Sequence, residues 1–143
     1  MDIREKKIEN VILFFANKVE SKSINRLKLM KLIWLSDRLH LNKYGRLIFK
    51  DRYKALEHGP VPSLAKNISE RNDIESINLK GKYDLKANKP FDADYFSVSD
   101  LEVLEYVWNK FGEFGKFQIH PIKCFESLSP NVSFPRVGFK RSY

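Results

Sequence analysis

The amino-acid sequence predicts a mainly α-helical, α+β protein: a compact bundle of about four to five helices around a central hydrophobic helix, with a small antiparallel β-hairpin or sheet. Residues 26–45, RLKLMKLIWLSDRLHLNKYG, place apolar side chains on almost every side of a helical wheel, which is typical of a helix surrounded by its neighbours. Stretches near the N-terminus and after residue 98 repeat apolar residues every three or four positions, as amphipathic helices do. Alternating apolar residues around Lys80 and Gly81 indicate the hairpin.

The first two helices follow from this spacing. Residues 3–19 are predicted to form an amphipathic helix whose apolar face is Ile8, Val11, Ile12, Phe15 and Val19. Residues 21–23 interrupt the pattern. The central helix is predicted to begin near Asn25 and to run to about residue 42. Tyr44-Gly45 ends it, because glycine adopts the left-handed conformation of a helix C-cap without strain.

The middle of the chain contains shorter elements. Residues 46–58 are predicted to form a connector, or a short strand followed by a turn. In Gly59-Pro60 we expect the glycine to supply an unusual φ and the proline to start a helix, which makes the pair a structural corner. Pro62 suits the first turn of this helix, which runs to about residue 71.

Two further elements complete the prediction. The hairpin alternates Ile77, Leu79, Tyr83 and Leu85. Residues 99–102, SDLE, match a capping box and open a helix that Gly112 ends. Trp34 and Trp108 lie on apolar helical stripes, so we expect them to pack in the core rather than to stack on bases.

The composition indicates a protein that folds around one core. The chain has 143 residues, 43% of them hydrophobic, which suits a single domain and excludes wholesale disorder. The single cysteine, Cys124, excludes an internal disulfide and fits a reducing compartment. No stretch reaches the roughly 20 apolar residues of a membrane span, and the N-terminus lacks the pattern of a signal peptide. We therefore expect a soluble, cytoplasmic protein.

Positive charge is concentrated in the first part of the chain. The net charge is +8, and residues 1–60 carry fourteen Lys and Arg against seven Asp and Glu. This asymmetry favours an acidic partner, which the charge alone leaves open between protein and nucleic acid. On the central helix, Lys28, Lys31 and Arg38 fall within about 80° of one another. This strip is either a contact surface for the partner or a solvated rim on a buried helix.

No pattern of catalytic or metal-binding residues is present in the sequence. His120 and Cys124 are four residues apart, but structural zinc needs four ligands and Pro121 disfavours a helix there. Cys124 has no neighbouring catalytic motif, and the sequence contains no glycine-rich phosphate loop. We therefore predict no enzymatic activity, no metal and no cofactor.

Several motifs together resemble a known family. They are the run LKLMKLIW at residues 27–34, then His40-Leu41, Tyr44-Gly45 and EHGPV at residues 57–61. In this order they resemble the Panacea domain, the SocA-like antitoxin domain that also occurs in phage-associated proteins. The resemblance covers about residues 5–115, so we expect a Panacea-like helical domain over residues 1–115 and an atypical tail over residues 116–143.

The resemblance implies an antitoxin that neutralises a cognate toxin by direct protein–protein binding, in a toxin–antitoxin or phage-defence system. A nucleic-acid-binding module that uses the basic N-terminal half is the alternative. The oligomeric state and the toxin's identity are left open. The candidate partner-binding residues are Lys28, Lys31, Arg38, Arg46 and Arg52. The residues expected to shape the motif are Trp34, Tyr44, Gly45, His58, Gly59 and Pro60.

The tail departs from the family pattern, which ends in a short helix and a Ser-His…Trp segment. One hypothesis is a frameshift near residues 134–138, FPRVG. TTT-CCC-AGA-GTG-GG is one set of codons that would encode this stretch, and the same string read one base later would encode Phe-Pro-Glu-Trp. Resequencing the gene tests this hypothesis.

Overall fold

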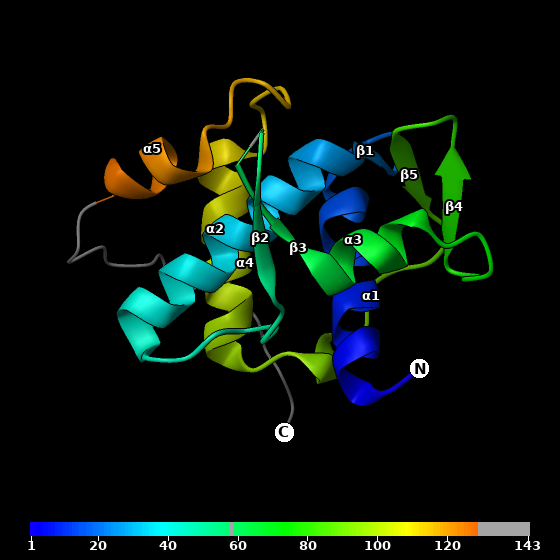
Figure 1. Ribbon diagram of the computed structural model, residues 1–143. Coiled ribbons are helices and arrows are strands. Elements are labelled where there is room, and N and C mark those ends of the chain that lie inside the picture. Colours follow the sequence, from blue (N-terminus) through cyan, green and yellow to red (C-terminus); the bar gives the residue numbers. More distant parts are fainter. Residues whose placement is uncertain (58, 129–143) are drawn as a thin grey trace.

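The computed structural model describes residues 1–57 and 59–128. His58, and residues 134–138 on which the frameshift hypothesis rests, lie outside the described residues. The described part is mainly helical with two small antiparallel sheets, which confirms the α+β prediction (Figure 1). Its elements in chain order are α1 (Ile3–Lys18), β1 (Ser23–Asn25), α2 (Arg26–Tyr44), β2 (Tyr53–Leu56), β3 (Gly59–Pro62), α3 (Ser63–Glu70), β4 (Ile77–Lys80), β5 (Asp84–Ala87), the 3-10 turn η1 (Ala93–Tyr95), α4 (Val98–Phe111) and α5 (Pro121–Glu126).

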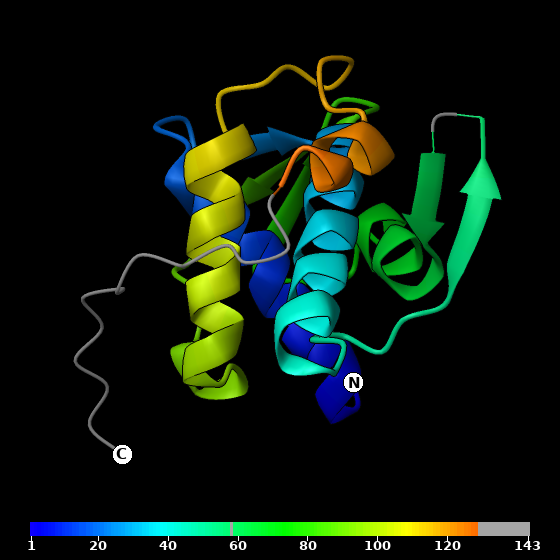
Figure 2. The same cartoon turned by 90° about the vertical axis from the view of Figure 1, so that its left-hand side faces the viewer.

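The central helix of the prediction is α2. It contacts α1, α3, α4, α5, β1 and β3, and Figure 2 shows it (cyan) beside α4 (yellow). Its N-cap is Asn25, whose side-chain oxygen accepts a hydrogen bond from the Leu27 N–H at 2.9 Å. Gly45 ends it with φ +77°, in the left-handed region. Both predicted ends of this helix are thus close to the observed ones, with its C-terminal end two residues later than expected.

The predicted hairpin is part of a three-stranded sheet with the order β1-β5-β4. Ile77 pairs with Ala87 and Lys80 with Asp84, which confirms the hairpin. The third strand, β1, begins at Ser23, the last residue of the predicted interruption at residues 21–23, and pairs Ile24 with Leu85. Three residues are too few to show a period of two, so no sequence pattern indicated this strand.

The Gly-Pro corner lies in a second hairpin, between β2 and β3. Gly59 has φ +111°, as the prediction of an unusual φ requires. The expectation that Pro60 starts a helix is wrong, because Pro60 lies within β3 opposite Ala55. Pro62 ends β3 and is the N-cap of α3, which begins one residue later. Neither proline has an N–H, so the backbone donors of β3 are those of Gly59 and Val61.

Helix α3 takes its N-terminal cap from a residue outside it. Pro62 makes no side-chain cap, and the carboxylate of Asp51 accepts hydrogen bonds from the N–H groups of Leu64 and Ala65, each at 2.9 Å. The first N–H groups of a helix have no partner within the helix. Asp51 therefore ties the connector before β2 to α3.

Helix α4 begins earlier than predicted. Its N-cap is Ser97, which forms a capping box with Asp100, so the predicted box of residues 99–102 is wrong. Two overlapping patterns, Ser97 with Asp100 and Ser99 with Glu102, have the same spacing. The pattern of Ser99 with Glu102 does not form a capping box, and the Ser99 hydroxyl is instead hydrogen-bonded to the ring of His40 at 2.9 Å.

The last described helix, α5, packs against α2 and β3. Pro121 is its first residue, where a missing N–H costs nothing, so the expectation that this proline disfavours a helix is wrong. The ring of Phe125 lies edge-on to that of Trp34, with centroids 6.2 Å apart. Ile119, just before the helix, is fully buried. Part of the predicted tail thus belongs to the packed structure, and the division at residue 115 stays a prediction.

Candidate partner-binding surface

The three cations predicted to form one basic strip on α2, Lys28, Lys31 and Arg38, lie in different environments. Arg38 is exposed, and its guanidinium lies 5.7 Å from the centroid of the Trp34 ring. Lys28 and Lys31 instead donate hydrogen bonds to backbone carbonyls, those of Gly112 and Lys116 respectively. Both carbonyls lie in the loop between α4 and α5, so these two lysines hold that loop onto α2.

The environment of the two lysines lowers their basicity. Lys31 is only 5% exposed, and Lys28 lies 5.2 Å from the ring centroid of Trp108. Burial lowers the pKa of both ammonium groups, because the charged form loses hydration. Long basic side chains that cross an apolar surface in this way also contribute packing.

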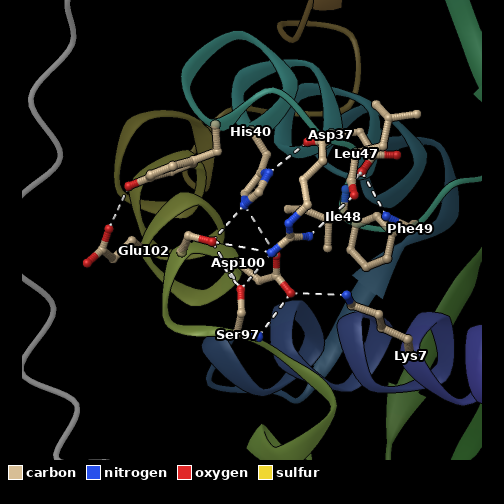
Figure 3. Close-up of polar contacts among 12 residues, drawn as sticks. Lys7, Asp37, His40, Leu47, Ile48, Phe49, Ser97, Asp100 and Glu102 are labelled. Carbon is tan, nitrogen blue, oxygen red and sulfur yellow. Dashed lines mark hydrogen bonds and ion pairs between the residues drawn. The ribbon is translucent and has the colours of Figure 1, made fainter.

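Arg46 belongs to a partly buried polar cluster around Asp100, which Figure 3 shows. Its guanidinium donates to the Asp100 carboxylate at 3.1 Å and to the Ser97 hydroxyl at 3.0 Å. The ammonium of Lys7, from α1, lies 3.0 Å from the other oxygen of Asp100. Asp100 is 1% exposed, whereas the Arg46 side chain is 44% exposed. The exposed part of Arg46 is therefore accessible to a partner while its guanidinium binds the cluster.

The charge state of Asp100 follows from its neighbours. Burial by itself would raise the pKa of this carboxyl. The hydrogen bond from the Ser97 N–H, together with the charges of Lys7 and Arg46, outweighs burial and holds the pKa below its ordinary value. Asp100 is thus a carboxylate that binds groups from α1, from the connector after α2 and from the start of α4.

His40 is the α2 member of the same cluster and is fully buried. One ring nitrogen, Nδ1, lies 2.7 Å from the Arg46 carbonyl, and Nε2 lies 2.9 Å from the Ser99 hydroxyl. Burial lowers the pKa of the imidazole, against opposing contributions from the Arg46 carbonyl and from Asp100. A carbonyl only accepts, so the neutral ring carries its proton on Nδ1 and accepts from Ser99 at Nε2.

A second buried carboxyl, Asp37, fixes the connector and the hairpin. One oxygen accepts from the N–H groups of Ile48 and Phe49, at 2.8 and 3.0 Å, and the other accepts from the Tyr53 hydroxyl on β2. Burial raises the pKa of Asp37, although these three donors oppose the rise. The connector that carries Arg46 and Arg52 is therefore held at both ends. Arg52 itself is exposed.

The residues expected to shape the motif have defined places, apart from His58. Trp34 is buried, and Tyr44 donates its hydroxyl to Glu102 at 2.9 Å while its ring lies 4.9 Å from that of His40. Gly45 and Gly59 both have positive φ, and a Cβ on Gly59 would meet the Pro121 ring at 3.8 Å. Pro60 follows Gly59 in β3.

Sequence patterns did not indicate the three buried carboxyls, Asp37, Asp51 and Asp100, as the organisers of this surface. The available signal was an acidic residue within the apolar run of α2, since buried Asp is rare unless it is bonded. Many of the bonded partners are distant in the chain: N–H groups 11 to 14 positions away for Asp37 and Asp51, and the side chains of Lys7 and Arg46 for Asp100. Only the fold brings those groups together.

The described residues contain no group of three or more His, Cys, Asp and Glu side chains placed to hold a metal ion. Cys124 is half-buried, and its N–H donates to the carbonyl of His120 in the first turn of α5. Within residues 1–57 and 59–128, no helix is both long and apolar enough to span a membrane.

The fold and its surface define a small α+β protein: one buried helix, enclosed by other helices and two short sheets, with basic side chains along the enclosing loops. The family model for the antitoxin SocA-like, Panacea domain matches residues 29–123. The match runs from the first turn of α2 to the middle of α5 and covers more than half of the chain, so the chain belongs to this family. Neither a curated protein nor a solved structure matches the chain.

Proposed function

We propose that this protein neutralises a cognate toxin by binding it directly, in a toxin–antitoxin or phage-defence system. Membership of the antitoxin SocA-like family is the observation that carries the proposal. A non-catalytic role agrees with that family. The mechanism is occlusion: a surface that is already folded covers the toxin, and a few well-packed side chains supply most of the affinity.

The polar clusters support this mechanism because they keep the surface in one shape. Asp100 joins α1, the connector and α4, and Asp37 joins α2, the connector and β2. A partner that meets a fixed surface loses less binding free energy to ordering. The proposed contacts are the exposed Arg38, Arg46 and Arg52, whereas Lys28 and Lys31 act by holding the α4–α5 loop.

The test uses the gene adjacent to this one in its genome, with its product expressed alone and together with this protein. We expect growth arrest by the neighbour alone and rescue by co-expression. Charge reversal of the two cations outside the Asp100 cluster, Arg38→Glu with Arg52→Glu, should weaken binding of the purified toxin by about tenfold or more. Lys80→Glu, on the exposed side of β4, is the matched control and should bind as the original does. Equal binding by the double variant would remove these arginines from the interface.

A nucleic-acid-binding role is the second candidate, and the excess of positive charge in residues 1–60 favours it. Such binding to duplex DNA would weaken steeply with added salt, because each phosphate contact releases a counterion. Binding of DNA at physiological salt that exceeds binding of the neighbouring gene product would support this candidate over the antitoxin proposal.

A further inference from the structure

A groove of about 560 Å³ lies between the start of α2, the β2–β3 hairpin, α3 and the loop from α4 to α5. Figure 1 shows where these elements lie in the fold, and Tyr83 of the β4–β5 turn also lines the groove. Met30 and Val61 line the groove and are buried. The volume is within the range of about 300–1,000 Å³ that is usual for ligand-binding clefts.

Apolar side chains from three separate elements surround the groove. Leu56 on β2 is 51% exposed, Tyr83 in the β4–β5 turn is 60% exposed, and Phe117 in the α4–α5 loop is 61% exposed. A single exposed apolar side chain is ordinary. Three large ones that meet at one concave surface indicate a place where another molecule is bound.

The charged side chains of the groove are mostly cations. Arg26, Lys66 and Lys116 line it, together with one acid, Glu70, which already pairs with Lys66 at 2.7 Å. Arg26 donates to the carbonyls of Ser69 and Lys82, and its Nε is buried without a hydrogen-bond partner in the described part of the chain. Among the described residues, no carboxylate forms an ion pair with Arg26 or Lys116. The groove thus offers two positive charges to an acidic ligand.

The wall that carries Lys116 is held in place. The Lys116 ammonium lies 5.2 Å from the ring centroid of Phe117 and 5.9 Å from that of Tyr83. Its carbonyl accepts the hydrogen bond from Lys31. Lys28 fixes the same loop at Gly112. Lys28 and Lys31, the two lysines of the family motif, therefore hold the α4–α5 loop, which forms one side of the groove.

The charge of the groove and its apolar side chains together indicate which kind of molecule binds there. A second copy of this chain is disfavoured, because its net charge is +8. Residues 129–143 carry three cations and no Asp or Glu, so they share the sign of the groove. Nucleic acid could use the two rings but would leave Leu56 and the buried aliphatic floor without apolar contacts. An acidic protein segment with one apolar face complements both features.

We propose that this groove binds an acidic amphipathic segment of the partner protein. Its apolar face packs on Leu56, Tyr83 and Phe117, and its carboxylates pair with Arg26 and Lys116. This inference rests on the proposed function, since the partner it describes is the toxin. It adds the place of contact and the chemistry that the toxin segment must have.

The first experiment measures binding of the purified toxic neighbour to the full-length chain by calorimetry. Leu56→Glu and Lys116→Glu should each weaken binding by about tenfold or more. The matched controls, Ile122→Glu and Lys123→Glu, change an apolar residue of 56% exposure and an exposed lysine on α5, and should leave it unchanged. Circular dichroism verifies that all four variants fold. If the groove variants bind and neutralise as the original does, the groove inference fails while the proposed function stands.

The second experiment measures binding of synthetic peptides to the groove in the absence of the toxin. The probes are a synthetic amphipathic peptide of about sixteen residues with Leu and Phe on one face and Glu on the other, and the same peptide with Lys in place of Glu. We expect the acidic peptide alone to shift the amide NMR signals of groove residues, and Leu56→Glu to abolish the shifts. Equal binding of both peptides, no binding of either, or tighter binding of a single-stranded oligonucleotide at these residues would overturn the inference. If no toxin is bound or neutralised, the proposed function fails, and these peptides still decide what the groove accepts.

Discussion

Individual buried polar residues determine how the helices of this protein meet. His40 is the clearest case, since it lies on α2 and contacts groups from the connector and from α4. The charged groups near its ring are Asp100, Arg46 and Lys7. Asp100 favours the protonated imidazole, and the two cations and burial oppose it. Because the net effect lowers the pKa, the folded protein binds a proton at His40 less readily than the unfolded chain does.

Protonation of His40 should therefore make the fold less stable in acid. The contribution of His40 to the free energy of unfolding should be constant above about pH 7 and should fall as the pH drops below the ordinary histidine pKa of 6.5, because the unfolded state then binds more protons. His40→Gln should remove this part of the pH dependence, since glutamine does not titrate. Urea unfolding at pH 5, 6 and 7 measures it.

The difference in pH dependence between the original protein and His40→Gln separates the contribution of His40 from those of other groups. The raised pKa of Asp37 acts in the opposite direction, because a carboxyl that prefers its proton in the folded state stabilises the fold as the pH falls. That contribution is common to both proteins and cancels. An identical pH dependence in the original and in His40→Gln would show that His40 titrates normally.

At the scale of single elements, caps that lie outside a helix matter as much as those at its own ends. Helix α4 follows the usual rule, with Ser97 and Asp100 capping each other. Helix α3 does not, because Pro62 precedes it and Asp51 supplies the acceptors. The carboxylate also meets the positive end of the helix dipole, which favours negative charge.

Removal of this cap should weaken α3 and the hairpin together. Asp51→Ala should lower the free energy of unfolding by about 1–2 kcal/mol, the usual effect of losing a helix N-cap. Ser63→Ala at the first position of the same helix is the control, because the Ser63 hydroxyl is buried and has no hydrogen-bond partner in the described residues. Urea denaturation followed by circular dichroism compares them. A loss in the Ser63 variant equal to that in the Asp51 variant would contradict the role of Asp51.

On the scale of the whole molecule, the described residues share one hydrophobic core. Side chains from α1, α2, α3, α4 and the three-stranded sheet contribute to it, as does Ile119 before α5. Trp34 and Phe125 connect α5 to this core. A continuous core of this kind favours unfolding in a single cooperative step.

The cysteine of α5 tests whether this helix unfolds with the rest. Cys124 is the single cysteine of the chain and is half-buried. Its rate of reaction with a thiol reagent should rise over the same range of urea concentration as the loss of helical circular dichroism. A rise at clearly lower urea would mean that residues after 115 form a separate, weaker unit, as the predicted division of the chain holds.

The sequence alone determined helices α1 to α4, apart from the exact start of α4, together with the hairpin of β4 and β5 and the family. The reason is that period and glycine position are local signals, as Gly45 at the end of α2 illustrates. The family was accessible because its motif combines several such local features between residues 27 and 61.

Only the tertiary structure decided which cations remain at the surface and where the groove lies. Lys28 and Lys31 share a face of α2 with Arg38, but their ammonium groups bond to carbonyls 84 and 85 positions later in the chain. A helical wheel gives the direction of a side chain and not what the rest of the chain places there. The burial of a charge depends on its distant partners, and the fold supplies those partners.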